Sequence, residues 1–193
     1  AETRMCGGEL SEAVCARGTG DQIVGTVVSP AGDGARGVRS IKALAVGDWN
    51  QYFLVINRNK KSMTLNLADH RGRALFRSLV GQADVVVENY KPGVMQRLGL
   101  EFEKLSQINP RVIVCSISGY GQYGPYSDRA AGDHAIQAMS GLMWMTGEAG
   151  GPPMWGGSAY TDVGAGLHAF GAICAALLHR HSTGEGERID VSL

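Results

Sequence analysis

The chain has 193 residues, of which 44% are hydrophobic and 19% are charged, and its 18 basic and 18 acidic side chains leave no formal net charge. This composition is typical of a globular protein and excludes an intrinsically disordered one. The balanced charge argues against a general attraction to nucleic acid or to an anionic membrane, so we expect neither as a partner. A local basic pocket for a phosphorylated cofactor is compatible with it.

The four cysteines are widely spaced and form no C-x-x-C pair, and the histidines share no metal-ligand pattern. The sequence therefore predicts no metal site. Two of the cysteines, Cys115 and Cys174, lie in apolar runs, and we expect both to be buried. Since we find no signal-peptide pattern and no apolar run of transmembrane length, we expect a reduced, cytoplasmic setting.

The expected elements begin late in the chain. Residues 1–48 have frequent glycines and weak apolar periodicity, with one strand-like run at 22–28 that Pro30 stops. We predict an irregular or divergent N-terminal segment at 1–48 and a partial α/β domain at 49–193. The expected elements of this domain, in chain order, are a strand at 62–67, a helix at 72–82, a strand at 84–88, one or two short helices at 94–105, a strand at 111–118, helices at 132–145 and 163–181, and the beginning of a strand at 189–193.

Strands that alternate with helices at this spacing predict an α/β fold with a Rossmann-like layer of parallel strands. The valine-rich run at 84–88 is typical of a strand buried on both faces of such a sheet. Because the sequence stops at 189–193, inside an apolar strand pattern, we expect the layer to be incomplete. Ligands of parallel sheets bind outside the carboxyl ends of the strands, so the loops at 89–93 and 119–125 lie on the expected ligand edge.

The loop Gly119–Gly124 fits the dinucleotide-binding pattern G-x-G-x-x-G and follows a predicted strand. Pro125 comes directly after it, however, so no helix begins there with its N-terminus toward a pyrophosphate. A nicotinamide-binding module is therefore disfavoured. The glycines instead allow some other ligand to approach the backbone closely.

Asp162 is a lone carboxylate among small and apolar residues, directly before the helical pattern at 163–181. As a helix cap, it would accept backbone N–H bonds from the first turn. As a nucleophile, it would attack an activated acyl group and carry a covalent intermediate. The residue pattern alone leaves both roles open.

Seven strings of residues resemble, in order and spacing, the class III CoA-transferase family. The strings lie at 57–62, 83–93, 97–100, 109–111, 118–121, 137–141 and 183–186. The family includes formyl-CoA and carnitine CoA-transferases, and α-methylacyl-CoA racemase is a related branch. Because family members are roughly twice as long, the resemblance identifies the chain as a partial member.

The resemblance implies an enzyme that moves CoA between an acyl-CoA thioester and a carboxylic acid, with Asp162 as the nucleophile that forms a mixed anhydride. By the same resemblance, the ring of Tyr90 would cover the adenine and the guanidinium of Arg97 would pair with a phosphate. The positions that match the family's coenzyme A contacts are Leu65, Asn89, Tyr90, Lys91 and Arg97.

The resemblance also implies an acyl-CoA and a small carboxylic acid as partners, and a homodimer whose chains interlock. The racemase branch has a catalytic histidine where this chain has Gly132, while His134 lies on the other side of Asp133. Transferase activity is therefore favoured over racemisation. A second hypothesis, from a different functional class, is a catalytically inert fragment or a CoA-binding remnant of such an enzyme.

Overall fold

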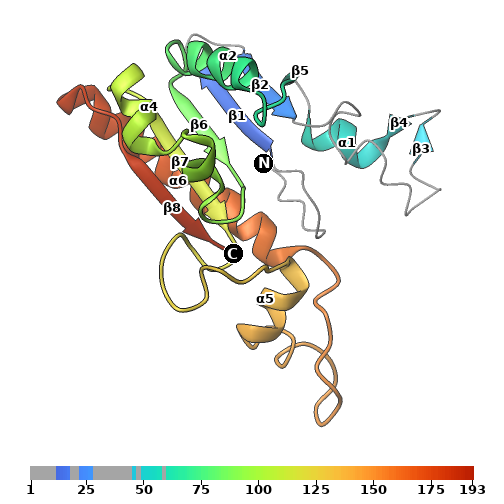
Figure 1. Cartoon of the computed structure of the whole chain (residues 1–193). Coiled ribbons are helices and arrows are strands. Elements are labelled where there is room, and N and C mark those ends of the chain that lie inside the picture. The colour runs from blue at the N-terminus through green and yellow to red at the C-terminus, as the bar shows by residue number, and fades with distance from the viewer. Residues whose placement is uncertain (1–11, 18–21, 28–44, 47–48, 58–59) are drawn as a thin grey trace.

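The computed structural model describes residues 12–17, 22–27, 45–46, 49–57 and 60–193 (Figure 1). Strands and helices alternate along most of this part of the chain, as the sequence predicts. The elements are β1 (Glu12–Arg17), β2 (Gln22–Val27), β3 (Ala45–Val46), β4 (Trp49–Asn50), α1 (Gln51–Ile56), β5 (Lys60–Thr64), α2 (His70–Val80), β6 (Val85–Glu88), α3 (Val94–Leu98), α4 (Phe102–Ile108), β7 (Ile113–Ser118), α5 (Asp133–Met139), α6 (Tyr160–Thr183) and β8 (Arg188–Ser192).

Six strands form the main sheet in the order β5-β2-β1-β6-β7-β8, and β3 pairs with β4 in a separate antiparallel ribbon. β6, β7 and β8 are parallel neighbours, and β5 is parallel to β2. β1 is antiparallel to both β2 and β6, so β2 and β5 point the same way as β6, β7 and β8. The predicted α/β class with a parallel layer is confirmed, and the antiparallel β1 is an addition. Five strands of the sheet thus have their carboxyl ends at one edge.

The N-terminal segment at 1–48, predicted to be irregular, contributes β1 and β2 to the main sheet. β2 coincides with the strand-like run at 22–28, whereas β1 has no alternation by which the sequence could reveal it. Most other residues of this segment lie outside the described residues. A domain boundary at residue 48 stays a prediction.

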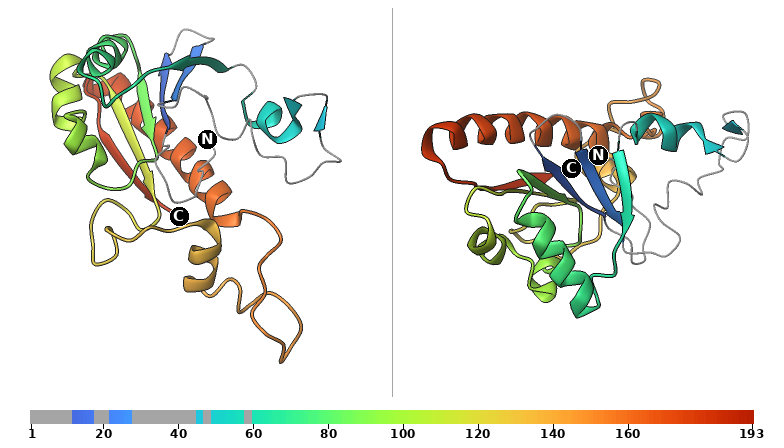
Figure 2. Two further views of the ribbon diagram at one scale, coloured as in Figure 1. Left: turned by 45° about the vertical axis from the view of Figure 1, so that its right-hand side comes forward. Right: turned by 90° about the horizontal axis from the view of Figure 1, so that it is seen from above.

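The two faces of the sheet are packed by different helices, with α2 on one side and α6 on the other (Figure 2). Successive strand residues point to opposite faces, so the neighbours Val85 and Val86 of β6 belong to different hydrophobic clusters. Val86 lies in the larger cluster with Phe76 of α2 and Leu105 of α4, and all three side chains are fully buried. This cluster is the main described core.

The opposite face receives small side chains of α6. Ala165 and Ala169 are buried against the β7 residues Cys115 and Ile117, and Ala176 is buried in a neighbouring cluster. Alanines let the helix backbone approach the sheet closely; Ile173 and Leu177 also pack against this face, while other large apolar side chains of α6 lie on its outer side. Cys115 is buried as predicted, whereas the prediction for Cys174 is wrong because it lies on that outer, exposed side.

α6 is longer than the sequence pattern at 163–181 predicts, and it is long and apolar enough to cross a membrane by length and composition. This finding corrects the expectation that no run reaches that length. Only 17% of its most apolar window is buried. Near its end, however, Arg180 donates to the carboxylate of Asp84 at 2.7 Å and to the carbonyl of Arg111 at 2.8 Å. These bonds tie α6 to the loops before β6 and β7.

Candidate active site

The carboxyl edge of the sheet collects the loops that follow β5, β6 and β7, as expected for parallel strands. The loop after β7 leads into α5, and α5 leads through a long connection into the first turn of α6. In Figure 1, α5 lies beyond the arrowhead of β8, so α5 is at the carboxyl edge of the sheet. The first turn of α6 holds Asp162.

Asp162 does not cap its own helix. The N-cap position of α6 is Ala159, which makes no side-chain capping bond. Instead, the backbone N–H and the hydroxyl of Thr161 donate to Oδ1 of Asp133 at 2.9 and 2.8 Å. Asp133 lies on α5 and is almost completely buried, so the start of α6 is capped by a residue from another helix.

The carboxylates of Asp133 and Asp162 differ greatly in how many hydrogen bonds they accept. Asp133 also accepts hydrogen bonds from Nε2 of Gln137 at 2.6 Å and from the indole of Trp155 at 3.4 Å. By contrast, Oδ1 of Asp162 is buried and has no hydrogen-bond partner among the described residues. Buried polar atoms without partners are rare, and they often mark functional sites.

The pKa values of the two carboxyls move in opposite directions. Burial raises the pKa of Asp133, but the bonds from Thr161, Trp155 and Gln137 outweigh burial and hold the pKa below its usual value. The pKa of Asp162 is raised to about 6, mainly by burial and also by the negative charge of Asp133, while His134 offsets part of the shift. A raised pKa in a partly buried carboxyl is typical of catalytic acids and bases.

A buried glutamine holds the connection before α6. Gln137 has no exposed surface, donates to the carbonyl of Ser158 at 2.8 Å and accepts the N–H of Gly156 at 3.1 Å. A β-carbon on Gly156 would come within 2.8 Å of the Tyr160 ring, so a larger residue there would force that ring to move. The Asp133 side chain and Gln137 together fix the backbone around Asp162.

His134 does not take the place of the racemase histidine. Its ring stacks on the indole of Trp155, with ring centroids 4.9 Å apart, and its side chain is exposed. The racemase position is Gly132, the N-cap of α5, which has no side chain to donate or accept a proton. The arrangement gives no support to proton transfer by a histidine next to Asp133.

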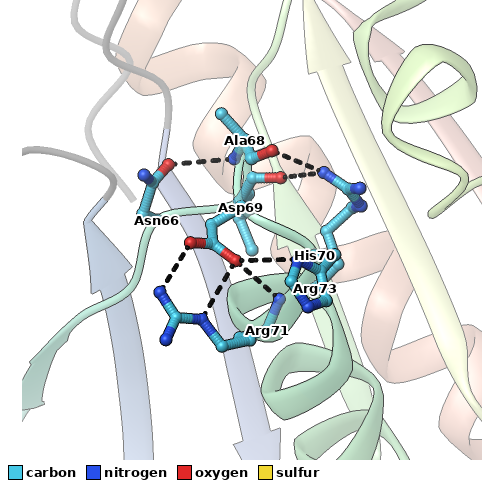
Figure 3. Close-up of polar contacts among 7 residues, drawn as sticks. Asn66, Ala68, Asp69, His70, Arg71 and Arg73 are labelled. Carbon is cyan, nitrogen blue, oxygen red and sulfur yellow. Dashed lines mark hydrogen bonds and ion pairs between the residues drawn. The ribbon is translucent and has the colours of Figure 1, made fainter.

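The first turns of α2, which follow the loop after β5, present basic side chains at the same edge (Figure 3). Asp69 caps α2 by accepting the N–H of Arg71 at 2.8 Å, and its carboxylate also pairs with the guanidinium of Arg71 at 3.1 Å. Nη1 of Arg73 donates to the carbonyls of Leu67 and Ala68 at 3.0 and 2.8 Å. These bonds fix the turn that follows Leu65.

The five positions matched to coenzyme A contacts divide into two groups. Leu65 and Tyr90 are buried in the main core, and Nδ2 of Asn89 donates to the carbonyl of Ile117 at 2.6 Å, which joins the ends of β6 and β7. Lys91 and Arg97 are exposed, Lys91 in the loop after β6 and Arg97 on α3. Their contact roles stay predictions.

Sequence reasoning missed the roles of Asp133 and Gln137. Their spacing of four places both on one side of α5, but the same spacing occurs in many exposed helices. What distinguishes them is burial, which depends on the connection at 155–161 folding back over α5. No cluster of three or more His, Cys, Asp or Glu side chains suited to a metal occurs among the residues that the structure describes.

The sequence of this chain matches the model of CoA-transferase family III over residues 23–193. It is 48% identical over 149 residues to an acetyl-CoA:oxalate CoA-transferase of Acetobacter aceti, covering 77% of this chain and 38% of that protein. It is 50% identical over 142 residues to a succinyl-CoA:glutarate CoA-transferase of Mus musculus, covering 74% of this chain and 33% of that protein. The chain thus spans about a third of the length of these curated relatives.

The fold agrees with solved structures. A crystal structure of a CAIB/BAIF family protein from Brucella suis matches with a TM-score of 0.80 and 41% identity, over 89% of this chain and 45% of that one. A protein from Mycobacterium tuberculosis matches with a TM-score of 0.73 and 30% identity, over 87% of this chain and 43% of that one. Sequence and fold agree over most of the chain, which therefore belongs to CoA-transferase family III.

Proposed function

We propose that this chain supplies the nucleophile and part of the coenzyme A site of a CoA-transferase, with Asp162 as the residue that carries the acyl groups. The observation that supports this most is the buried Oδ1 of Asp162, which has no hydrogen-bond partner in the described part of the chain. A carboxylate that is held by few hydrogen bonds is more reactive toward an acyl carbon than a fully solvated one.

The proposed reaction balances without a proton. The Asp162 carboxylate attacks the thioester carbonyl, the C–S bond breaks, and the CoA thiolate leaves a mixed anhydride behind. The thiolate then attacks the aspartyl carbonyl, which releases the donor acid and leaves CoA on Asp162 as a thioester. The acceptor carboxylate attacks this thioester, its C–S bond breaks, and a second mixed anhydride and the free CoA thiolate form. Finally, the thiolate attacks the acceptor's acyl carbon and restores the Asp162 carboxylate.

Asp133 supports this chemistry in two ways. Its two hydrogen bonds from Thr161 fix the first turn of α6, and thereby the backbone of Asp162. Its charge also contributes to the raised pKa of Asp162, about 6, at which the nucleophile is still ionised at neutral pH. We therefore expect acyl transfer to decline as the pH falls through about 6.

The proposed substrates are an acyl-CoA and a small carboxylic acid. Lys91 and Arg97 are exposed cations near the ends of parallel strands, where they suit the phosphates of coenzyme A. The relatives described above are named for oxalate and glutarate, which are both dicarboxylic acids. We extend this to a dicarboxylic acceptor here.

We also propose that the protein is a cytoplasmic homodimer. The outer side of α6 exposes large apolar side chains, among them Leu167 at 66%, Phe170 at 67% and Leu178 at 74%. A continuous apolar helix side of this kind is typical of protein interfaces. Light scattering of the purified protein tests the dimer, and fractionation of the host cell tests the location.

Trapping the covalent intermediate tests the assignment of Asp162. The protein is incubated with acyl-CoA and then with hydroxylamine, which converts an aspartyl anhydride or thioester into a hydroxamate. Peptide mass spectrometry should find the hydroxamate at Asp162. Asp162→Ala should lower transfer by about a thousandfold or more, since removing a nucleophile abolishes the covalent route.

Glu103→Gln is the matched control, because Glu103 is an exposed carboxylate on α4. It should leave transfer unchanged. Normal activity of Asp162→Ala, or a hydroxamate at another residue, would refute the assignment. The alternative of a CoA-binding remnant predicts a melting temperature that rises with added CoA, but no hydroxamate.

A further inference from the structure

We infer that Glu88 and Asp190 are positioning residues, which hold the loops after β6 and β7 in a fixed relation and thereby set the affinity for the CoA part of the substrate. The inference rests on the proposed coenzyme A site, since Lys91 lies in the first of these loops. Neither carboxylate is needed in the acyl-transfer chemistry of Asp162.

The two carboxylates stand in one row across the parallel strands. Glu88 of β6 pairs in register with Ser116 of β7, and Ser116 pairs with Asp190 of β8. Side chains at paired positions of neighbouring strands point to the same face. Glu88 is 2% exposed and Ser116 is 5% exposed, so the row is largely buried.

Each carboxylate accepts one backbone N–H from a loop. Oε2 of Glu88 accepts the N–H of Tyr90 at 2.7 Å, two residues after the strand ends. Oδ2 of Asp190 accepts the N–H of Gln122 at 2.9 Å, across 68 residues of sequence. The left-handed φ of +83° at Gly121 turns the chain for this bond, and glycine adopts that conformation without strain.

A side-chain hydrogen bond links Ser116 to Glu88, so the row is connected through β7. Beside it lies a small cavity lined by Glu88, Ser116 and Gln122, with Lys91 at its border. Two buried polar atoms near this row, Nε2 of Gln122 and Oδ1 of Asp190, lack partners among the described residues. One is a hydrogen-bond donor and the other an acceptor, so an ordered water could bridge them.

The charges around Glu88 come from several elements. The pKa of Glu88 is raised to about 6 because burial outweighs the hydrogen bonds from Ser116 and Tyr90 and the charge of Arg188, which lower it; the charge of Asp190 adds to the rise. Other ionisable groups near the row are Lys91 in the loop, Glu101 before α4 and Cys115 on β7. Protonation of Glu88 weakens it as an acceptor, so its hold on the Asn89–Gly93 loop should weaken as the pH falls through about 6.

Kinetics of the Glu88→Ala and Glu88→Gln variants test the inference. Glu88→Ala removes the acceptor for the Tyr90 N–H, and we expect KM for acyl-CoA to rise about tenfold, the usual effect of one lost hydrogen bond to a charged group, with kcat within about twofold. Glu88→Gln keeps an amide oxygen as acceptor and should restore most of the affinity. Unlike the wild type, its KM should not rise between pH 7 and about pH 5.5, because the amide does not titrate there.

Asp190→Ala gives an independent test on the second loop, because it removes the acceptor for the Gln122 N–H. Its effect on KM and that of Glu88→Ala should be non-additive, because the two residues share one row. A loss confined to kcat, or a KM that rises with falling pH in Glu88→Gln as it does in the wild type, would overturn the inference.

Amide hydrogen exchange tests the positioning role of Glu88 independently of whether the protein transfers CoA. In the wild type the amides of Tyr90 and Gln122 should be protected, and Glu88→Ala should release the Tyr90 amide while those of β7 stay protected. This result is expected even if the protein transfers no CoA. Unchanged protection of the Tyr90 amide in a folded Glu88→Ala would refute the positioning role, and if that variant does not fold, the pH profile of Glu88→Gln decides.

Discussion

The two faces of the sheet differ in how they meet their helices. On the face covered by α2 and α4, large side chains such as Phe76 and Leu105 have no exposed surface. On the other face, α6 buries mainly alanines and exposes several larger apolar residues, such as Phe170. The first face therefore carries most of the stability of the described chain. The second face carries the carboxylate that we propose to be reactive, and an apolar surface suited to association.

The largest effect on the free energy of unfolding is expected from a substitution on the sheet face covered by α2. Phe76→Ala removes a fully buried ring and should lower the free energy of unfolding by about 3–5 kcal/mol. Leu75→Ala is the control on the same helix, since Leu75 is 58% exposed, and should cost less than about 0.5 kcal/mol. Urea unfolding followed by circular dichroism measures both. Equal effects of the two substitutions would contradict the assignment of the core to this face.

A smaller loss of stability is expected from removing the side chain of α5 that caps α6. Asp133→Ala removes the cap and leaves the donors of Thr161 and Gln137 without their acceptor, so it should cost about 2 kcal/mol. The exposed Asp128→Ala should be neutral. The measurement is the midpoint of urea unfolding at neutral pH. If Asp133→Ala is as neutral as Asp128→Ala, the cap across helices contributes nothing.

Asp162→Asn should stabilise the protein while abolishing transfer. The folded-state pKa of Asp162 is raised to about 6 from 3.8, so this carboxyl contributes stability that is complete below about pH 4 and is lost as the pH rises through about 6. The neutral amide avoids this loss. We expect a gain of about 1 kcal/mol at pH 7.5, after allowance for solvent screening, and none below pH 4. Melting temperatures across this pH range measure it, and a gain that is independent of pH would contradict the raised pKa.

The smallest effect on the stability of the chain is expected on the outer side of α6. Phe170→Ser changes a side chain that is 67% exposed and should alter the free energy of unfolding of the isolated chain by less than about 0.5 kcal/mol. If this side of α6 forms the proposed dimer, the same change should shift the mass from light scattering toward the monomer. A large loss of stability with no change in mass would show that the surface is internal packing instead.

Local patterns accounted for the strand at Val85–Glu88, the helix after it and the long helix α6, because their hydrophobic spacing reflects burial that neighbours in sequence share. The start of α5 was also close to its predicted place. Its end was not, because Gly141, with a φ of +81°, follows the last turn in a stretch that still reads as helical. β1 escaped prediction because its residues show no clear alternation, and because its pairing with β6 joins parts of the chain that are distant in sequence.

The sequence by itself determined the family, through motifs in a fixed order, and it marked Asp162 as either a cap or a nucleophile. Only the tertiary structure showed that Asp162 does not cap α6 within the chain, and its role as a nucleophile stays our proposal. Asp133 approaches from another helix and takes the capping bonds, so Oδ1 of Asp162 is left buried without a partner among the described residues. Hydrogen-bond satisfaction depends on which groups meet in space, and such contacts across helices leave no periodic trace in a sequence.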